Sequence, residues 1–408
     1  MTTAPSLSLS KFHRLELLIL LGLLQAMAPV SIDMYLPAMP ELERVFQASA
    51  SAVESTMVTY LIGFALGQLL YGPITDRFGR KPPLYFGLGL FTLSSALCAF
   101  APSIAIMSGL RLFQAIGACG GSVISRAMVR DIFPPDELRR VFSMLILVLG
   151  VSPILAPLFG SYLLLWFGWR AAFLAQATIG ALLFLGMHFR LRESMAAESR
   201  RPLLMSSIVS AYTTLVRDRT FLGASLVCGF SSAGAFAYIA SAPFVFMNLY
   251  KVPTEHFGWL FGSVAAGMVA GSQVNGRMPH RIALWKVLRV ANLVQLAAAI
   301  LLMASVASGV GGLPVVYFCI FVYIAAQGFV FPNGSAIAMT RHGQIAGSAS
   351  ALLGTNQFLI AAVGTSFLGF LENPALPMTI VILTCAVIST VLNYLTLGPR
   401  LETGPTAS

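Results

Sequence analysis

Long apolar stretches separated by short polar segments make up most of the 408-residue chain. A helix needs roughly 20 residues to cross about 30 Å of hydrocarbon at ~1.5 Å per residue. On that scale the pattern predicts twelve membrane-spanning segments, and runs this long and uniformly apolar indicate helices rather than a closed barrel. The segments are 15–38, 53–73, 83–101, 104–128, 141–163, 169–189, 220–246, 256–275, 286–307, 314–339, 345–370 and 376–397.

Composition supports an integral membrane protein. Of the residues, 57% are hydrophobic and 10% are charged, whereas about a quarter of a soluble domain is charged. All five cysteines lie in apolar stretches without metal-ligand spacing, so we expect small buried hydrophobes and no metal site. We therefore expect lipid, rather than a soluble core, to cover most of the apolar surface.

The basic residues set the expected orientation. The net charge of +10 could indicate a nucleic-acid partner, but Lys and Arg also collect in the cytoplasmic loops of membrane proteins. With the N-terminus inside, the only Lys or Arg residues outside cytoplasmic segments are Arg44, Arg111, Arg170 and Lys251. This asymmetry favours cytoplasmic termini and no nucleic acid. Ala26-Met27-Ala28 resembles a signal-peptidase site, but cleavage there would split the first span.

The longest connection, residues 190–219, begins with charges and continues as an amphipathic stretch. It predicts a cytoplasmic linker with a short interfacial helix between a six-helix half at 1–189 and another at 220–408. Two echoes support a repeat. GPITDR at 72–77 resembles GSQVNGR at 271–277, and GGSVI at 120–124 resembles NGSAI at 333–337.

The loop after the second span reads GPITDRFGRKP, residues 72–82. Gly72 would let helices approach closely, Asp76 can receive an arginine, and Gly79 permits a tight turn, while Arg77 and Arg80 are basic. This loop resembles the signature of the major facilitator superfamily, G-x-x-x-D-R-x-G-R-[RK], at every fixed position. The resemblance implies an all-α transporter fold with twelve helices in two halves.

Two further stretches fit this resemblance. RLFQAIGA at 111–118 resembles the fourth-helix motif of the superfamily, and Arg111 should face a cavity or partner, although snorkelling to the outer surface is an alternative. GVSPILAPLFG at 150–160 resembles the antiporter motif, with Gly150, Pro153, Pro157 and Gly160 in place. Ala156 and Ser161 depart from that motif. The resemblance implies export.

Taken together, IDMYLPAMP, GPITDRFGRKP and SRAMVRDIFP resemble the bicyclomycin-resistance (Bcr/CflA) group of drug:proton antiporters. In related exporters, loop arginines and an acid at the inner end of the fourth span form a charge relay. The resemblance implies a gate latch of Asp76, Arg77, Arg80 and Asp131. Such a latch would hold the inner ends of the halves together in the outward-facing state.

Asp33 stands in the outer part of the first span, and an intramembrane ionisable group is a functional candidate. A carboxyl group kept from water can bind and release a proton as access alternates. The resemblance implies that Asp33 couples proton entry to drug exit, with Arg111 as its nearest positive partner. The alternative is an interfacial Asp33 that caps the segment before Pro37.

Substrate contacts are predicted only loosely, as aromatic or hydrogen-bonding groups able to line a cavity for amphiphilic drugs. Helix packing is an equally good interpretation of each. The candidates are Tyr35, Tyr60, Phe64, Gln114, Phe236, Tyr238 and Asn333.

The sequence also bears on other classes of protein. A proton-coupled importer or exporter of a native metabolite is the main alternative to a drug exporter. An intramembrane enzyme is disfavoured because no second acid accompanies Asp33 at its depth, and an ATP-driven pump because no G-x-x-x-x-G-K-[ST] loop occurs. We expect a monomer in the bacterial inner membrane that uses small-molecule drugs, protons and no cofactor.

Overall fold

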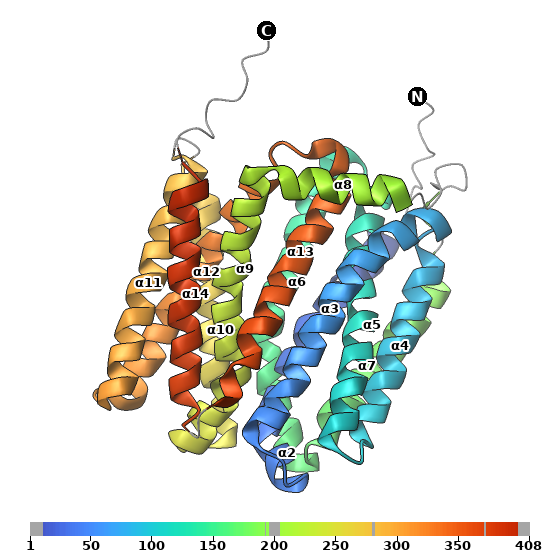
Figure 1. Cartoon of the computed structure of the whole chain (residues 1–408). Coiled ribbons are helices and arrows are strands. Elements are labelled where there is room, and N and C mark those ends of the chain that lie inside the picture. Colours follow the sequence, from blue (N-terminus) through green and yellow to red (C-terminus); the bar gives the residue numbers. More distant parts are fainter. Residues whose placement is uncertain (1–10, 192, 196–204, 280–281, 371–372, 399–408) are drawn as a thin grey trace.

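The computed structural model describes residues 11–191, 193–195, 205–279, 282–370 and 373–398. Within these residues no strand occurs, and twelve segments are long and apolar enough to cross a membrane. The predicted all-helical class and number of spans are confirmed. The helices stand side by side, with α8 (Met205–Arg217) across one end and α2 (Met39–Val45) at the other, here called the α8 end and the α2 end (Figure 1).

The other long helices follow in chain order. They are α1 (Lys11–Asp33), α3 (Ala50–Phe78), α4 (Lys81–Ala99), α5 (Ile104–Ile132), α6 (Pro135–Phe167), α7 (Arg170–Arg190), α9 (Arg219–Pro243), α10 (Thr254–Arg277), α11 (Leu284–Ser308), α12 (Gly312–Met339), α13 (Ala346–Ser366) and α14 (Ala375–Thr396).

Several helices extend beyond the predicted spans. The second span was expected at 53–73, whereas α3 covers Ala50–Phe78, and the fifth was expected at 141–163, whereas α6 covers Pro135–Phe167. An apolar window detects only the part of a helix in hydrocarbon. The backbone hydrogen-bond ladder continues past it into polar surroundings, until a glycine with positive φ such as Gly168 (φ +75°) ends it.

The first and seventh spans are corrected in a different way. The first was expected to be one helix over 15–38, but α1 ends at Asp33 and is followed by the 3-10 turn η1 (Leu36–Ala38) and by α2. Pro37 and Pro40 lack the backbone donors that would continue α1. In the seventh, α9 ends at Pro243 and passes into the π-helical turn η3 (Phe244–Leu249).

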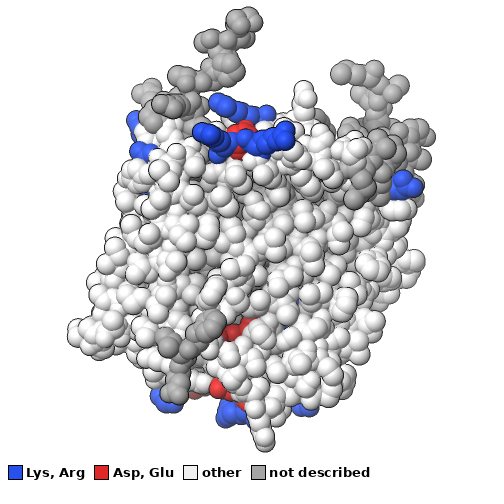
Figure 2. Space-filling view, in the orientation of Figure 1, with Lys and Arg blue, Asp and Glu red and all other residues white. Residues whose placement is uncertain are grey.

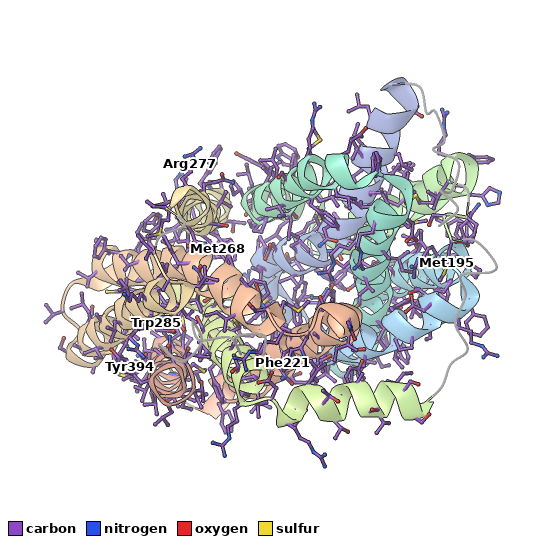
Figure 3. The ribbon with its side chains drawn as sticks, turned by 90° about the horizontal axis from the view of Figure 1, so that it is seen from above. Met195, Phe221, Met268, Arg277, Trp285 and Tyr394 are labelled. Carbon is purple, nitrogen blue, oxygen red and sulfur yellow. The ribbon has the colours of Figure 1, made fainter. Side chains whose placement is uncertain are left out.

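Helices α1–α7 form what we call the first half and α9–α14 the second half. Between them, α3 packs against α13 and α6 against α10. Seen from the α8 end, α8 runs from near Phe221 in the second half along the edge of the first half (Figure 3). An amphipathic helix in the connection agrees with the sequence. The division at 1–189, 190–219 and 220–408 stays a prediction, and residues 192 and 196–204 lie outside the described part.

The surface has the polarity of a membrane protein. On the face seen in Figure 2, Lys and Arg side chains gather at the α8 end, a smaller number lie at the α2 end, and a nearly uncharged belt separates them. Large apolar side chains such as Phe86, Leu93 and Phe189 are more than half exposed. Lipid tails would cover this belt, so the fold places a multi-pass chain in a bilayer.

Candidate functional site

Asp33 is the last residue of α1, at the point where Pro37 prevents the helix from continuing. Its side chain is 3% exposed, and no Lys, Arg or His in the described residues lies within 4.0 Å of its carboxylate. The carboxylate is close enough to interact electrostatically with the phenols of Tyr60 on α3 and Tyr238 on α9. Asp33 is therefore buried where the two halves meet and is not exposed at the surface of the protein.

Arg111, on α5, is fully buried, so it does not snorkel to the surface. Its Nη1 donates to the carbonyl oxygen of Ser31 (2.9 Å) and to Oε1 of Gln114 (2.6 Å). Its guanidinium carbon lies 4.7 Å from the ring centre of Tyr35 and 4.3 Å from that of Tyr60. These contacts hold the cation in the interior, against the end of α1.

The expected ion pair between Arg111 and Asp33 is absent from the described residues. The physical reason lies in the end of α1. Its last carbonyls lack intrahelical partners and carry the negative end of the helix dipole, which attracts a cation. Arg111 binds the carbonyl of Ser31 there. Its Nε and Nη2 make no hydrogen bond within the described structure, so donors remain for another conformation or a ligand.

A buried polar chain extends from Arg111 across the first half. Gln114 donates from Nε2 to Ser95 Oγ (2.7 Å) on α4 and to Gln176 Oε1 (2.8 Å) on α7. Ser95 and Gln176 were not predicted, because an isolated Ser or Gln in an apolar helix gives no signal of its partner. Together these residues fix the orientation of the Arg111 guanidinium.

The aromatic candidates separate into groups. Tyr35 donates to or accepts from Thr56 (2.7 Å) and, with Tyr60, faces Arg111. Phe64 and Phe236 approach the same ring, Phe358 on α13, at centroid distances of 4.5 and 5.5 Å. Phe358 was missed because the chain contains 29 phenylalanines and most of the predicted spans have at least one.

Tyr238 and Asn333 make other contacts. Tyr238 stacks on Phe261 of α10, and its hydroxyl has no hydrogen-bond partner in the described residues. Asn333 donates to Asn275 Oδ1 (2.8 Å) and to the carbonyl of Phe329. None of these contacts links Asn333 to the groups around Arg111 and Phe358. Its hydrogen bond to Asn275 instead joins the segments 333–337 and 271–277, which are the second-half members of the two repeated motifs.

The signature loop builds an ion-pair network within the first half. Arg80 donates from Nη1 to Asp76 (3.0 Å) and from Nε to Asp131 (2.8 Å). Burial lowers the pKa of Arg80, but the two carboxylates outweigh it and hold the pKa above its ordinary value. The backbone N–H groups of Arg80 and Lys81 donate to the Glu193 carboxylate.

Other residues of the loop behave differently. Gly79 has φ +85°, which confirms the tight turn expected there. Arg77 is exposed, and its guanidinium lies 5.5 Å from the Phe78 ring. Among the described residues it joins no ion pair. The latch residues Asp76, Arg80 and Asp131 are thus brought together in one half, and Arg77 is not part of their contact.

The expectation that helices approach each other closely at Gly72 is wrong for this conformation. A Cβ there would meet no atom within 4 Å, because Gly72 lines a cavity of about 580 Å³ at the α8 end. Both halves line this cavity, with Gln68 and Arg126 from the first and Met339 and Ala351 from the second. The halves are therefore separated at the α8 end.

At the α2 end the halves are in contact. Ser241 on α9 donates to Glu54 on α3 (3.2 Å), and Asn248 donates to Glu43 on α2 (3.3 Å). A Cβ on Gly369 would lie 2.0 Å from the Cβ of Ser51. Contact at one end and a cavity at the other is the geometry of an inward-facing transporter if the α8 end is cytoplasmic.

The antiporter-motif helix α6 links these regions. Pro153 and Pro157 lie inside an α6 that continues on both sides of them. The carbonyl of Pro157 is 3.0 Å from where a Cβ on Gly258 of α10 would lie, and Gly160 packs on the backbone of Met34. Gly150 faces Val269 on α10. The motif therefore lies at the contact between halves and beside Asp33.

Glu54 is a functional candidate that the sequence did not reveal. It is 5% exposed, although it lies in the second turn of α3. Tyr35 and Thr56 are hydrogen-bonded, and Asp33 and Glu54 each lie two residues from that pair, on opposite sides. At ~1.5 Å per residue their depths differ by about 6 Å. A second buried acid thus lies about one helical turn from Asp33 in depth, and the expectation that no second acid lies at the depth of Asp33 stays a prediction.

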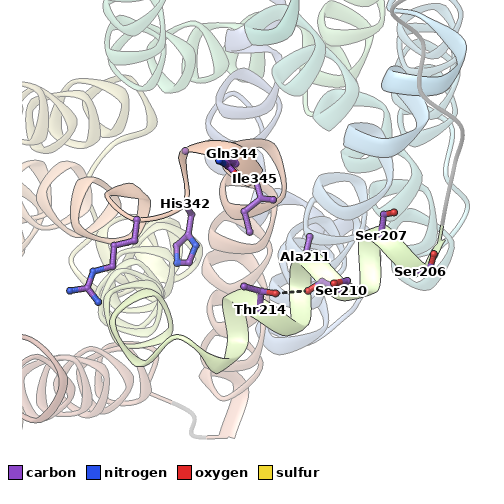
Figure 4. A pocket seen from close by; sticks show the side chains of 10 residues that line it. Ser206, Ser207, Ser210, Ala211, Thr214, His342, Gln344 and Ile345 are labelled. Carbon is purple, nitrogen blue, oxygen red and sulfur yellow. Dashed lines mark hydrogen bonds between the residues drawn. The ribbon is translucent and has the colours of Figure 1, made fainter. Parts of the chain in front are cut away.

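A second cavity, of about 920 Å³, lies at the α8 end between α8 and residues Arg341–Ile345 (Figure 4). Hydroxyl groups of Ser206, Ser207, Ser210 and Thr214 line the α8 side. Beside it, His342 contacts Asp218 at 2.8 Å, which ties the connection before α13 to the start of α9. Asp33 does not line this second cavity.

The fold and these contacts define a twelve-helix membrane transporter with a cavity open at one end. A family model described as Major Facilitator Superfamily matches residues 21–365. The chain belongs to this superfamily, which consists of transporters rather than enzymes, and the resemblance drawn from residues 72–82 is confirmed.

Similar proteins indicate which group of the superfamily the chain resembles. An uncharacterized MFS-type transporter of Bacillus subtilis, YdgK, is 37% identical over 92% of this chain and 94% of that protein. A chloramphenicol resistance protein of Pseudomonas aeruginosa is 30% identical over 91% and 88%. A bicyclomycin resistance protein homolog of Haemophilus influenzae is 29% identical over 92% and 94%. These names support the predicted drug-antiporter group.

Solved structures agree on the fold. A bacterial homologue of the human lysosomal transporter Spinster superposes with a TM-score of 0.77 at 17% identity, over 97% of this chain and 100% of that chain. A D-xylose-proton symporter gives a TM-score of 0.76 at 16% identity, over 95% and 98%. At such identities the likeness concerns the fold alone.

Proposed function

We propose that the protein exports antibiotics or other amphiphilic drugs across the bacterial inner membrane in exchange for protons. Bicyclomycin-type compounds are the favoured substrates, because relatives are named for bicyclomycin and chloramphenicol resistance. The α8 end is cytoplasmic in this proposal, because Lys and Arg gather there. The protein works as a monomer and needs no cofactor, since the proton gradient drives it.

The burial of Asp33 carries the proposal. A carboxylate that is 3% exposed and has no cationic partner among the described residues is costly to keep ionised. It therefore holds a proton while buried and releases it when the site opens to water at higher pH. Because Asp33 lies at the junction of the halves, opening and closing of the halves changes its access to water.

The cavity at the α8 end supplies the route for the drug. A cytoplasmic drug would enter between the halves, past Gln68, towards the aromatic pair of Phe64 and Phe358. Closure at the α8 end and opening at the α2 end would then release it outside. The Arg80 network would rest within the first half in the inward-facing state and meet the second half when the α8 end closes.

The test compares the parent chain with Asp33→Asn in a pump-deleted host and in proteoliposomes. Asn keeps the size of the side chain but cannot titrate, so proton-driven export should be lost while membrane insertion and thermal stability are retained. Glu255→Gln, an exposed acid in the first turn of α10, is the matched control and should export normally. A fully resistant Asp33→Asn strain would show that Asp33 is not the coupling group.

A further inference from the structure

Glu54 is buried at the α2 end in a way that the proposed role of Asp33 does not explain. It belongs to the membrane-spanning part of α3, yet its side chain is 5% exposed. In the described residues no Lys, Arg or His forms an ion pair with it. A glutamate so close to the end of a span could reach water by a small rotation, so its burial is a consequence of how the halves meet.

The contact that buries Glu54 comes from the other half. Ser241 Oγ on α9 donates to Glu54 Oε1 at 3.2 Å, and the two residues are 187 positions apart. Asn248 in η3 donates to Glu43 at 3.3 Å, beside it. Both hydrogen bonds join the first half to the second at the α2 end. Separation of the halves at this end breaks both bonds and exposes Glu54 to water.

Among the described residues packed around Glu54, no cation forms an ion pair with its carboxylate. From α2 the interacting group is the carboxylate of Glu43, which is of the same sign, and the Arg44 Nε lies against the carbonyl of Pro40. From α5, Arg111 is held by Ser31, Gln114 and two tyrosine rings. The α9 side presents Ser241, and α13 contains no charged residue.

We propose that Glu54 is a second proton-binding site, which takes a proton from the solution at the α2 end before that end closes. Burial of an unpaired carboxylate costs several kcal/mol, and a like charge nearby adds to the cost. Water at the open α2 end donates the proton to a Glu54 carboxylate oxygen, and the protonated acid is then buried against Ser241. When the Ser241 contact breaks, the proton returns to the same solution.

This role rests on the proposed proton-driven cycle but differs from that of Asp33. The Asp33 proton crosses the membrane, whereas the Glu54 proton returns to the side from which it came. Glu54 would therefore leave the number of protons per drug unchanged. It would make closure of the α2 end, and so the turnover rate, depend on the pH of the outer solution.

The experiment measures opening of the α2 end directly, with no drug present. Spin labels are placed on the full chain at Val45→Cys, the last residue of α2, and at Val310→Cys, in the turn between α11 and α12 of the second half; both positions are exposed. The five native cysteines are buried and should remain unlabelled. Distance distributions in lipid nanodiscs are recorded from pH 5 to pH 9. The background is Asp33→Asn, which removes the titration of the first acid.

In this background we expect the long-distance, open population to grow as the pH rises. Adding Glu54→Gln should abolish that response and leave the α2 end closed at every pH. Glu54→Asp should retain a response, because it keeps a titratable group, and the matched control Glu255→Gln should not change it. If Glu54→Gln aggregates, Glu54→Ala combined with Ser241→Ala removes both partners and supplies the same comparison.

Two results would overturn the role of Glu54. One is an Asp33→Asn protein whose distances do not change with pH. The other is an Asp33→Asn/Glu54→Gln protein that keeps the pH response of Asp33→Asn. Neither result bears on drug export, which is lost or retained in the separate Asp33→Asn resistance test. The two proposals can therefore fail independently.

Discussion

The contact between Gly160 and the backbone beside Asp33 gives a prediction whose size follows from the structure. A Cβ on Gly160 would lie 2.2 Å from the carbonyl oxygen of Met34, 2.9 Å from its carbonyl carbon and 3.0 Å from its Cα. All three are backbone atoms, so no side-chain rotation can relieve the clash. Ordinary C···O contacts are about 3.3–3.6 Å. Gly160→Ala must therefore separate α6 from the end of α1 by about 1 Å.

Overpacking of this kind costs roughly 1–3 kcal/mol. The matched control is Gly89→Ala, because Gly89 lies inside α4 and a Cβ there meets no atom within 4 Å. At such a site alanine stabilises a helix by roughly 0.5–1 kcal/mol. Both variants gain this helix propensity, so we expect them to differ in unfolding free energy by the cost of overpacking, about 1–3 kcal/mol.

The measurement is thermal unfolding of the detergent-solubilised proteins, together with the drug concentration that inhibits growth of a pump-deleted host. Gly160→Ala should unfold at a lower temperature than Gly89→Ala and confer less resistance, because Asp33 is adjacent to the displaced Met34. If both variants unfold at the same temperature and confer equal resistance, the helices are not packed through Gly160, and the position given to Asp33 must be revised.

Three further substitutions test other contacts. Arg111→Lys loses the planar group that binds Ser31 and Gln114 and stacks on two tyrosines. Because a hydrogen bond to a charged group is worth about 1.5–3 kcal/mol, resistance should fall at least tenfold. The control Arg170→Lys, at an exposed arginine 4.5 Å from the Trp169 ring, should keep its resistance. Arg80→Gln should lower the unfolding temperature more than Arg77→Gln, because of these two arginines Arg80 alone forms an ion pair with a described residue; equal effects would contradict this. Asp218→Ala removes an N-cap of α9, which costs roughly 0.5–2 kcal/mol. Burial raises the pKa of Asp218, but the N–H groups of Thr220 and Phe221 and the His342 side chain outweigh it and lower that pKa. The stabilisation by Asp218 is then present above the ordinary aspartate pKa of about 3.9 and is lost as pH falls through the lowered pKa. The difference in unfolding temperature between the parent chain and Asp218→Ala should therefore persist from pH 7 to pH 5, and its disappearance in this range would refute the role.

Much of the architecture could be predicted because lipid imposes a simple rule on sequence. The length of each apolar run is fixed by the bilayer, and this rule alone gives the twelve spans. The loop at 72–82 was predictable for a different reason, since a positive φ at Gly79 and ion pairs between neighbouring positions are local properties. Such features need no knowledge of which helices are neighbours.

The contacts of the buried polar groups could not be predicted in this way. Arg111 binds a backbone carbonyl that is free only because α1 ends at Asp33, and that end depends on Pro37. In the sequence Glu54 is the second residue of the predicted span 53–73, and only the approach of α9 buries it. Gln176 is 62 positions from Gln114. In each case the partner is set by the packing of helices, about which a hydrophobicity pattern contains no information.

The two halves differ in whether they bury charged side chains. The first half buries Asp33, Glu54, Arg80 and Arg111. In the described part of the second half, no Asp, Glu, Lys or Arg is buried.

Two neutral residues of the second half lie at positions that correspond to polar residues of the first half. Gln327 on α12 accepts from Ser231 and from Gln295, much as Gln114 organises α5, and Asn275 occupies the position that echoes Asp76. Protonation of a buried carboxylate can therefore change the electrostatic energy of the first half, which contains Asp33 and Glu54. Because Glu54 and Ser241 join these unequal halves directly, the α2 end is where a change in protonation of the first half can alter its contact with the second.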